Sequence, residues 1–188
     1  MSDTLVRTTI AERLQAAKTA STVLATATAD QKNRALRAIA DAVRGNIERI
    51  TPANQQDLAN GREKGLSTGL LDRLTLDEAR LGALADSVLV IAALVDPVGE
   101  VLGGKTLPNG LKLSQVRVPF GVVGAIYEAR PNVTIDIASL ALKSGNAAVL
   151  RGGSAAENTN RVLVELIQGA LASADLPAIS ATAAPKAA

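Results

Sequence analysis

The residues best suited to bind a ligand lie in a short glycine-rich turn, Arg151-Gly152-Gly153-Ser154. Paired glycines let a backbone bend sharply and approach a ligand without obstruction by a Cβ atom. Arg151 carries a forked set of donors that suits a phosphate, and Ser154 with Glu157 fits a capping box at the start of a helix. A helix that follows a strand in this way has N–H groups available for an anion. The segment therefore predicts a phosphate site, and a purely structural turn with a solvated arginine is the alternative.

A second set of polar residues precedes this turn, in the loop 128–132. This loop follows an apolar run that ends at Tyr127. Open parallel sheets bind ligands at the carboxyl ends of their strands. Arg130 and Asn132 would stand at such an end, and Tyr127 and Glu128 lead into it. A surface loop without a function has much the same composition, so the structural alternative also stays open here.

The composition limits the chemistry that the chain performs. It contains no cysteine and no histidine, which excludes a disulfide, a thiolate metal site, a thiol nucleophile and an imidazole base. Its aromatic rings are those of Phe120 and Tyr127, too few to stack on successive bases. The net charge is +2, with no long run of one sign. We therefore expect neither a metal site nor nucleic-acid binding.

The composition also bears on the location of the protein. The first residues, MSDTLVRTTIAERL, lack the apolar stretch of a secretory signal, and no apolar run is long enough to span a bilayer. With 47% hydrophobic and 20% charged residues, the chain has the composition of a globular protein with a core. We expect a cytoplasmic protein that does not bind a membrane.

Residues 1–98 show helical periodicity. Between Thr28 and Ile50 the apolar residues recur at the spacing of one helix face, and a further apolar helix runs to about Val95. Three helix starts are indicated by threonines: Thr28 with Gln31 and Thr75 with Glu78 as capping boxes, and Thr51 as the N-cap before Pro52. The region is predicted to be a helical N-terminal part of the fold.

Residues 99–118 predict a β-hairpin. The runs 99–106 and 111–118 read as strands, and Leu107-Pro108-Asn109-Gly110 lies between them. An Asn-Gly pair after proline is a strong turn signal. The alternation of apolar and polar residues in the second run is imperfect, which is typical of a strand with one partly wet face.

Residues 119–177 predict a βαβα unit. Residues 121–127 form a continuous apolar run, as in a central parallel strand covered on both faces. A short helix over 133–143, a buried strand over 146–150 and a helix over 157–172 follow. This succession is typical of a doubly wound sheet, so the fold class is α/β with an incomplete, Rossmann-like doubly wound domain.

The pattern ends after Leu176-Pro177. Residues 178–188 have no hydrophobic period, so we expect an irregular tail at the place where a third parallel strand should begin. A parallel sheet of two strands cannot bury both of its faces. The chain therefore looks cut short, and the sequence leaves open a fragment, a frameshift product or a natural truncation.

The segment from Pro119 to Asn160, with the motifs YEARPNVT, ALKSGN and LRGGSAAENTN, resembles γ-glutamyl phosphate reductase (glutamate-5-semialdehyde dehydrogenase) of the aldehyde dehydrogenase superfamily. The resemblance extends back through the LPNGL hairpin to about residue 10 and stops near Pro177. It implies an N-terminal portion of a cofactor domain of the aldehyde dehydrogenase type. It also implies that the hairpin 99–118 is an arm that serves homo-oligomerisation.

The resemblance implies an enzyme of proline biosynthesis that uses NADPH to reduce L-glutamyl 5-phosphate to glutamate 5-semialdehyde, with release of phosphate. In this family a cysteine thiolate forms a thioester, which hydride from the nicotinamide then reduces. By similarity, the turn from Arg151 to Ser154 lies where the adenosine ribose and its 2′-phosphate are held, next to Tyr127 and Glu128. Asn132, or else Arg130, matches the asparagine that stabilises the oxyanion.

The chain departs from the family in one respect that concerns catalysis. Family members are much longer, and their catalytic domain with its nucleophilic cysteine lies beyond the matched part. Because this chain has no cysteine, we expect it to be inactive as a reductase on its own. A non-catalytic nucleotide-binding or oligomerisation module is the alternative, and a remnant that does not fold and associates through an exposed sheet edge is a third interpretation.

Overall fold

The computed structural model describes residues 9–178 and 181–183. Within these ranges five helices precede the hairpin: α1 (Ile10–Leu24), α2 (Ala29–Gly45), α3 (Ile47–Glu63), α4 (Thr68–Leu74) and α5 (Glu78–Ala93). The capping box at the start of α2 is confirmed, because Gln31 N donates to Thr28 Oγ1 at 3.2 Å and Thr28 N donates to Gln31 Oε1 at 3.0 Å. In the described part of the chain, no helix is both long and apolar enough to cross a membrane.

Two of the predicted helix starts are wrong. Helix α3 begins at Ile47, so Pro52 lies inside it, and the burial of Ile50 outweighs the local signal of Thr51-Pro52. Before α5, Thr75 Oγ1 donates to the carbonyl oxygen of Leu71, which closes the preceding helix α4 instead. Tertiary packing and competing hydrogen bonds of a threonine hydroxyl override an N-cap signal in both cases.

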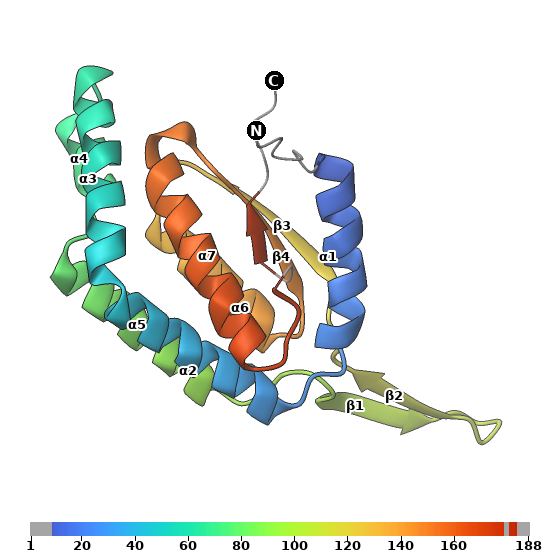
Figure 1. The fold of residues 1–188 in the computed structure, drawn as a ribbon. Helices are drawn as coiled ribbons and strands as arrows, with labels where there is room; N and C mark the ends of the chain where they lie inside the picture. Colours follow the sequence, from blue (N-terminus) through green and yellow to red (C-terminus); the bar gives the residue numbers. More distant parts are fainter. Residues whose placement is uncertain (1–8, 179–180, 184–188) are drawn as a thin grey trace, which may run out of the picture.

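The α/β class is confirmed, with three parallel strands in one sheet: β3 (Val122–Tyr127), β4 (Ala147–Gly152) and β5 (Ala181–Ala183). Helix α6 (Asn132–Lys143) connects β3 to β4, and α7 (Glu157–Ser173) connects β4 to β5 (Figure 1). The expectation that no third strand begins in the tail 178–188 is wrong, because Ala181–Ala183 pairs with Ala148–Leu150.

The sheet lies between layers of helices. Helix α1 packs on β3, β4 and β5, while α6 and α7 pack against each other and cover the other face, and α2 and α5 form an outer layer on them. The apolar core fills the space between the sheet and these two layers. Strand β4 is central and its first four residues are buried. Strand order follows chain order, so the described residues do not include the reversal of strand order that defines a doubly wound sheet.

The prediction that residues 121–127 form a central strand covered on both faces is wrong. In the described sheet β3 is an edge strand, and Ile126 is 79% exposed. The continuous apolar run correctly indicated a hydrophobic strand. It could not show that this strand has a neighbouring strand on only one side in the described sheet.

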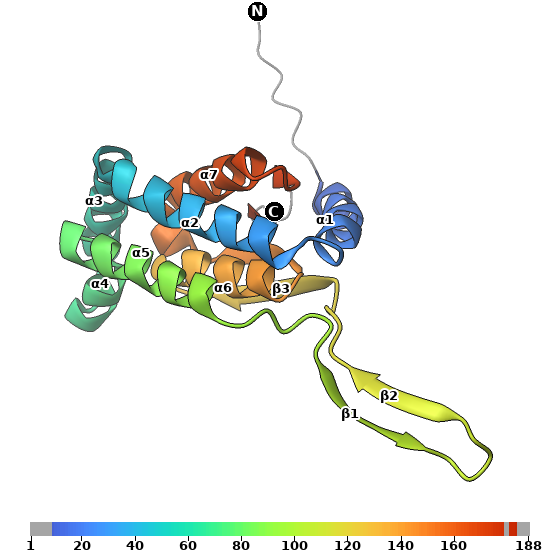
Figure 2. The ribbon, with the colours of Figure 1, turned by 90° about the horizontal axis from the view of Figure 1, so that it is seen from below.

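The predicted hairpin is confirmed as β1 (Val101–Thr106) and β2 (Lys112–Val116), paired antiparallel with a register shift between Val101 and Gly103. Gly110 takes a φ of +85°, a conformation that suits glycine, and its N–H donates to the carbonyl oxygen of Leu107 at 2.8 Å. The hairpin projects from the body (Figure 2), and every residue of both strands is exposed. An isolated two-stranded hairpin is marginally stable in water.

A buried polar network holds the base of the hairpin. Lys32 of α2 is 1% exposed, and its Nζ lies 2.5 Å from Asp96 Oδ2. The other oxygen of Asp96 accepts from Val98 N at 3.0 Å. Beside them, Lys143 Nζ donates to Asn33 Oδ1 at 2.7 Å and to the carbonyl oxygen of Ala92 at 2.9 Å, while burial lowers the pKa of Lys143. The buried cations therefore fix the path of the chain between α5 and the hairpin.

We expect Asp96→Ala to destabilise the fold by about 3–5 kcal/mol, because it leaves the ammonium group of Lys32 buried without a counter-ion. Urea denaturation followed by circular dichroism measures the loss. The matched control is Asp86→Ala, which breaks the exposed ion pair with Arg44 and should cost no more than about 1 kcal/mol. Equal effects of the two substitutions would contradict this view of the hairpin base.

Candidate functional site

The glycine-rich segment 151–154 does not form a turn over its whole length. Strand β4 continues through Arg151 and Gly152, which pair with Ile126 and Tyr127 of β3. Gly153 is extended, with φ −64° and ψ 160°. A short 3₁₀ helix, η1 (Ser154–Ala156), follows before α7 begins. The chain therefore turns over Gly153 and η1.

The capping box predicted for Ser154 and Glu157 is wrong. Helix α7 begins at Glu157 with Ala156 as its N-cap residue, and no side-chain cap hydrogen bond is formed there by the N-cap residue. Ser154 is instead the first residue of η1. A serine-to-glutamate spacing of three cannot distinguish an α-helix start from an intervening 3₁₀ turn.

The packing of the protein leaves no room for a side chain at Gly152 and little room at Gly153. A Cβ atom on Gly152 would lie 2.1 Å from Asn160 Nδ2 and 3.3 Å from Tyr127 Cε2. A Cβ atom on Gly153 would lie 3.2 Å from Glu128 Cα. The structure thus brings Tyr127, Glu128, Gly152 and Gly153 into contact, as the position of both segments at the carboxyl edge of the sheet predicted.

The N-terminus of α7 is occupied by a carboxylate from a distant part of the chain. Asn158 N and Nδ2 donate to Asp57 Oδ1 at 3.2 and 2.8 Å, and Thr159 N and Oγ1 donate to Asp57 Oδ2 at 2.8 and 2.6 Å. Asp57, in α3, is 1% exposed. The prediction that this helix terminus offers N–H groups to a ligand phosphate is therefore wrong at these two residues, because the protein supplies the anion itself.

Arg151 is an exposed cation at this edge. Its guanidinium has no ion-pair or hydrogen-bond partner among the described residues. Residues opposite each other in neighbouring strands share a sheet face, so Arg151 lies on the same face as the exposed Ile126, the face on which α1 packs. A free cation beside an exposed apolar side chain suits a ligand that has both a phosphate and a hydrophobic ring.

Asn132 and Arg130 lie on the same edge of the sheet, in the connection from β3 to α6. Asn132 is the first residue of α6, and its Nδ2 donates to Asp136 Oδ2 at 3.1 Å. Burial raises the pKa of Asp136, partly offset by this hydrogen bond. Arg130 is exposed, and its backbone N–H donates to the carbonyl oxygen of Glu128 at 2.7 Å. Asn132 is thus the more ordered of the two side chains.

A chain of hydrogen bonds joins the end of β3 to α6 and α7 at this edge of the sheet. Tyr127 OH lies 2.6 Å from Thr134 Oγ1, which donates to Asn160 Oδ1 at 2.8 Å. Thr134 is fully buried, and burial raises the pKa of Tyr127. Asp57, Thr134 and Asn160 were not predicted as functional residues from the sequence. The available signal was a polar residue at a helix position facing the core, which Asp57 shows in α3.

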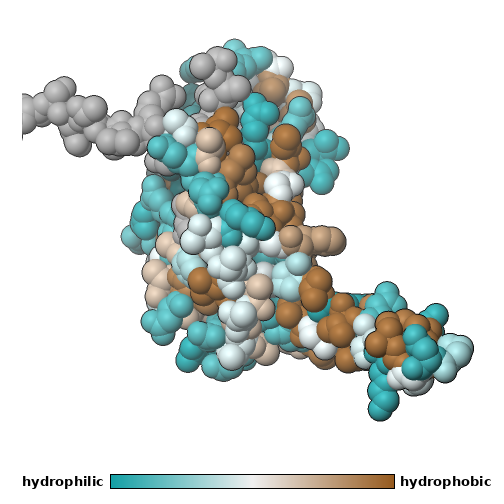
Figure 3. Space-filling view, turned by 90° about the vertical axis from the view of Figure 1, so that its right-hand side faces the viewer, coloured by the Kyte–Doolittle hydropathy of each residue, from teal (hydrophilic) through white to brown (hydrophobic). Residues whose placement is uncertain are grey.

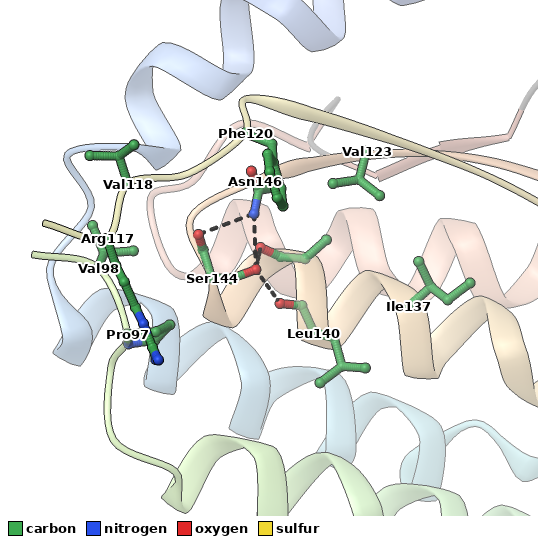
Figure 4. Close-up of a pocket in the computed structure, with 11 residues that line it drawn as sticks. Pro97, Val98, Arg117, Val118, Phe120, Val123, Ile137, Leu140, Ser144 and Asn146 are labelled. Atoms are coloured by element: carbon green, nitrogen blue, oxygen red, sulfur yellow. Dashed lines mark hydrogen bonds between the residues drawn. The ribbon is translucent and has the colours of Figure 1, made fainter. Parts of the chain in front are cut away.

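A hollow of about 430 Å³ lies at the opposite, amino end of the strands, between α6 and the base of the hairpin (Figure 4). Phe120 and Leu140 line it, and they are 92% and 52% exposed. Its single charged residue, Arg117, is paired with Glu100 at 2.8 Å. The hollow therefore lacks the free polar groups of a nucleotide site and suits an apolar contact.

Comparisons with known proteins bear on the family. A protein of Leifsonia xyli subsp. xyli (strain CTCB07) named gamma-glutamyl phosphate reductase is 65% identical over 178 residues, which are 95% of this chain and 42% of that protein. The crystal structure of gamma-glutamyl phosphate reductase from Thermotoga maritima superposes with a TM-score of 0.88 at 39% identity, over 92% of this chain and 42% of that one. No family model matches the chain.

The chain matches an N-terminal portion of γ-glutamyl phosphate reductase. The predicted resemblance is thus confirmed, and the chain spans about two fifths of the length of the relatives that it matches. A probable aldehyde dehydrogenase from Listeria monocytogenes EGD-e has the same fold over this region, with a TM-score of 0.67 at 20% identity. The Arg151 edge lies in the part of the chain that matches γ-glutamyl phosphate reductase.

We expect Gly152→Ala to destabilise this fold by about 1–3 kcal/mol, because the added methyl group collides with Asn160 and breaks its hydrogen bond with Thr134. The matched control is Gly169→Ala inside α7, where a Cβ atom meets nothing within 4 Å. That substitution should stabilise the chain by about 0.5–1 kcal/mol. Urea denaturation compares them, and a neutral Gly152→Ala would refute the packing role.

Proposed function

We propose that the chain is the cofactor-binding part of an NADPH-dependent oxidoreductase that reduces L-glutamyl 5-phosphate to L-glutamate 5-semialdehyde in proline biosynthesis. The observation that carries this proposal is the free cation Arg151 at the carboxyl edge of the sheet, in a chain 65% identical to a protein named gamma-glutamyl phosphate reductase. In the proposed domain division, residues 119–177 bind the cofactor and residues 99–118 form an arm. A cytoplasmic location belongs to the same proposal.

The residues at the edge fit the adenosine end of NADPH. A dianionic 2′-phosphate needs a cation with several donors, and Arg151 has its whole guanidinium available. Gly152, Gly153 and Ser154 bring backbone to the same place, and Tyr127 and Glu128 lie next to these glycines at the end of β3. The cofactor would supply a hydride when bound, and these residues would bind and orient it.

The substrate end would lie at Asn132, with Arg130 beside it. The amide of Asn132 is held by Asp136, which leaves its second N–H available to an oxyanion. The chain has no cysteine to form a thioester. We therefore infer that its own contribution is binding, and that the 188 residues alone do not reduce glutamyl phosphate. This lack of a nucleophile also favours the second candidate function, a nucleotide-binding module.

We expect Arg151→Ala to weaken NADPH binding by about ten- to a hundredfold, because the 2′-phosphate loses its charge-assisted hydrogen bonds. NADH, which lacks that phosphate, should bind with an affinity within about threefold of its value for the unaltered chain. Titration followed by nicotinamide fluorescence measures both affinities. Arg34→Ala, which removes an exposed arginine of α2, is the control and should change neither. Unchanged NADPH binding by the Arg151 variant would reject the cofactor site.

We further propose that a second copy of the chain covers the hairpin. Both faces of the hairpin are exposed, and they carry apolar side chains at Val101, Leu111, Leu113 and Val116. Figure 3 shows apolar surface on the hairpin and on the adjoining body. Because a lone hairpin gains little stability in water, a contact that buries these side chains would stabilise it.

We expect the double substitution Leu111→Thr, Leu113→Thr to weaken self-association at least about tenfold, since it removes apolar surface while it introduces β-branched residues, which favour β-structure, into the hairpin. Sedimentation equilibrium over a range of protein concentrations gives the dissociation constant. The control is Val95→Thr, at a position that is 91% exposed outside the hairpin. A monomeric unaltered chain, or association that is insensitive to the double substitution, would contradict the proposal.

A further inference from the structure

The N-terminus of α7 immediately follows the cofactor edge, and its first turn is fixed by residues from two different helices. On one side Asp57 of α3 accepts four hydrogen bonds, from the backbone and side chains of Asn158 and Thr159. On the other side Thr134 of α6 donates to Asn160 at 2.8 Å. Three consecutive residues of α7 are thus bound by partners that do not belong to the sheet.

The carboxylate of Asp57 is held in one orientation by its surroundings. Thr159 Oγ1 donates to Asp57 at 2.6 Å and accepts from Asn54 Nδ2 at 3.2 Å. Asn54 is itself fixed, since its amide donates to the carbonyl oxygen of Leu74 at 2.8 Å and accepts from Leu76 N at 2.8 Å. Such a fully connected polar network permits a single arrangement of its members.

Apolar packing holds the same segment against α3. Ala156, the last residue of η1, is fully buried and clusters with Leu58 of α3 and Leu74 of α4. Leu58 follows Asp57 in sequence, so the ionic and the apolar contact come from the same turn of α3. The short connection between Gly152 and α7 therefore has little freedom to shift.

We propose that Asp57 is a positioning residue for the cofactor edge: it supplies the anion at the N-terminus of α7 and thereby sets the place of Arg151 and the two glycines. This proposal rests on the NADPH-binding function proposed above. A ligand phosphate cannot reach the amides of Asn158 and Thr159, because a buried carboxylate already holds them. The positive end of α7 is compensated within the protein, so Arg151 is left as the group that recognises the 2′-phosphate.

A positioning role of Asp57 and a general loss of stability have different effects on the affinities for NADPH and NADH. A substitution that only lowers the folded fraction reduces the apparent affinities for NADPH and NADH by the same factor. Misplacement of Arg151 affects the 2′-phosphate, which NADH lacks, and so changes the ratio of the two affinities. The ratio of NADPH to NADH affinity is therefore the informative measurement.

The test uses Asp57→Asn in the full chain, which keeps the size of the side chain but places an amide NH₂ against donors. We expect hydrogen exchange at the amides of Asn158 and Thr159 to accelerate at least about tenfold, and the affinity ratio to fall at least about fivefold. Thr159→Val, which removes one of the four donors and keeps the carboxylate, is a milder variant that should shift both quantities in the same direction. Asp41→Asn, at an exposed position of α2, is the matched control.

The outcomes distinguish this inference from the proposed function. If Arg151→Ala abolishes the preference for NADPH but Asp57→Asn and Thr159→Val leave the ratio within about twofold of its original value, the positioning role is wrong and the cofactor site stands. If the unaltered chain binds neither nucleotide, the proposed function and the positioning role both fail. Hydrogen exchange at Asn158 and Thr159 still decides whether Asp57 caps α7, and unaltered exchange in the Asp57 variant would overturn that as well.

Discussion

The contact between the carboxylate of Asp57 and the first turn of α7 is the constraint on which the rest of this structure depends. A buried carboxylate is unfavourable unless donors surround it, and free N–H groups at a buried helix terminus are unfavourable without an acceptor. Asp57 and α7 satisfy each other, with Thr159 almost fully buried beside them. This joins the helical half of the chain to the sheet at the edge where the glycines and Arg151 lie.

The sequence predicted those elements whose signal is local. The capping box of α2, the Asn-Gly turn of the hairpin and the helices α6 and α7 were recognisable because their determinants lie within a few residues of each other. Strand β5 was missed because Ala181–Ala183 is only three residues long and two of them are alanines, which are poor strand formers, so the strand exists through its pairing with β4. β-structure depends on such long-range partners more than helix does.

In the candidate site, too, the features with local signals were predicted and those that depend on distant residues were not. The position of Arg151, Gly152 and Asn132 at the carboxyl edge followed from the order of strands and helices, which sequence periodicity gives. The reason for the glycines did not follow, because the side chain of Asn160 and the backbone of Glu128 that crowd them belong to other elements. Nor did the Asp57 cap, which joins residues about one hundred positions apart. Local capping rules cannot find an acceptor that arrives from another helix.

The polar network at the base of the hairpin and the one at the carboxyl edge of the sheet use charged side chains differently. At the base of the hairpin, Lys32 and Asp96 form a buried pair beside the cation of Lys143. At the carboxyl edge, Asp57 compensates a helix terminus, and Arg151 has no partner among residues 9–178 and 181–183. An exposed arginine adds little to the stability of the fold, whereas Asp57, Asn158 and Thr159 nearby are hydrogen-bonded to one another. The fold thus uses its buried charges for structure and keeps two exposed arginines, Arg151 and Arg130, at the edge, which is the distribution expected of a site whose counter-ion is a ligand.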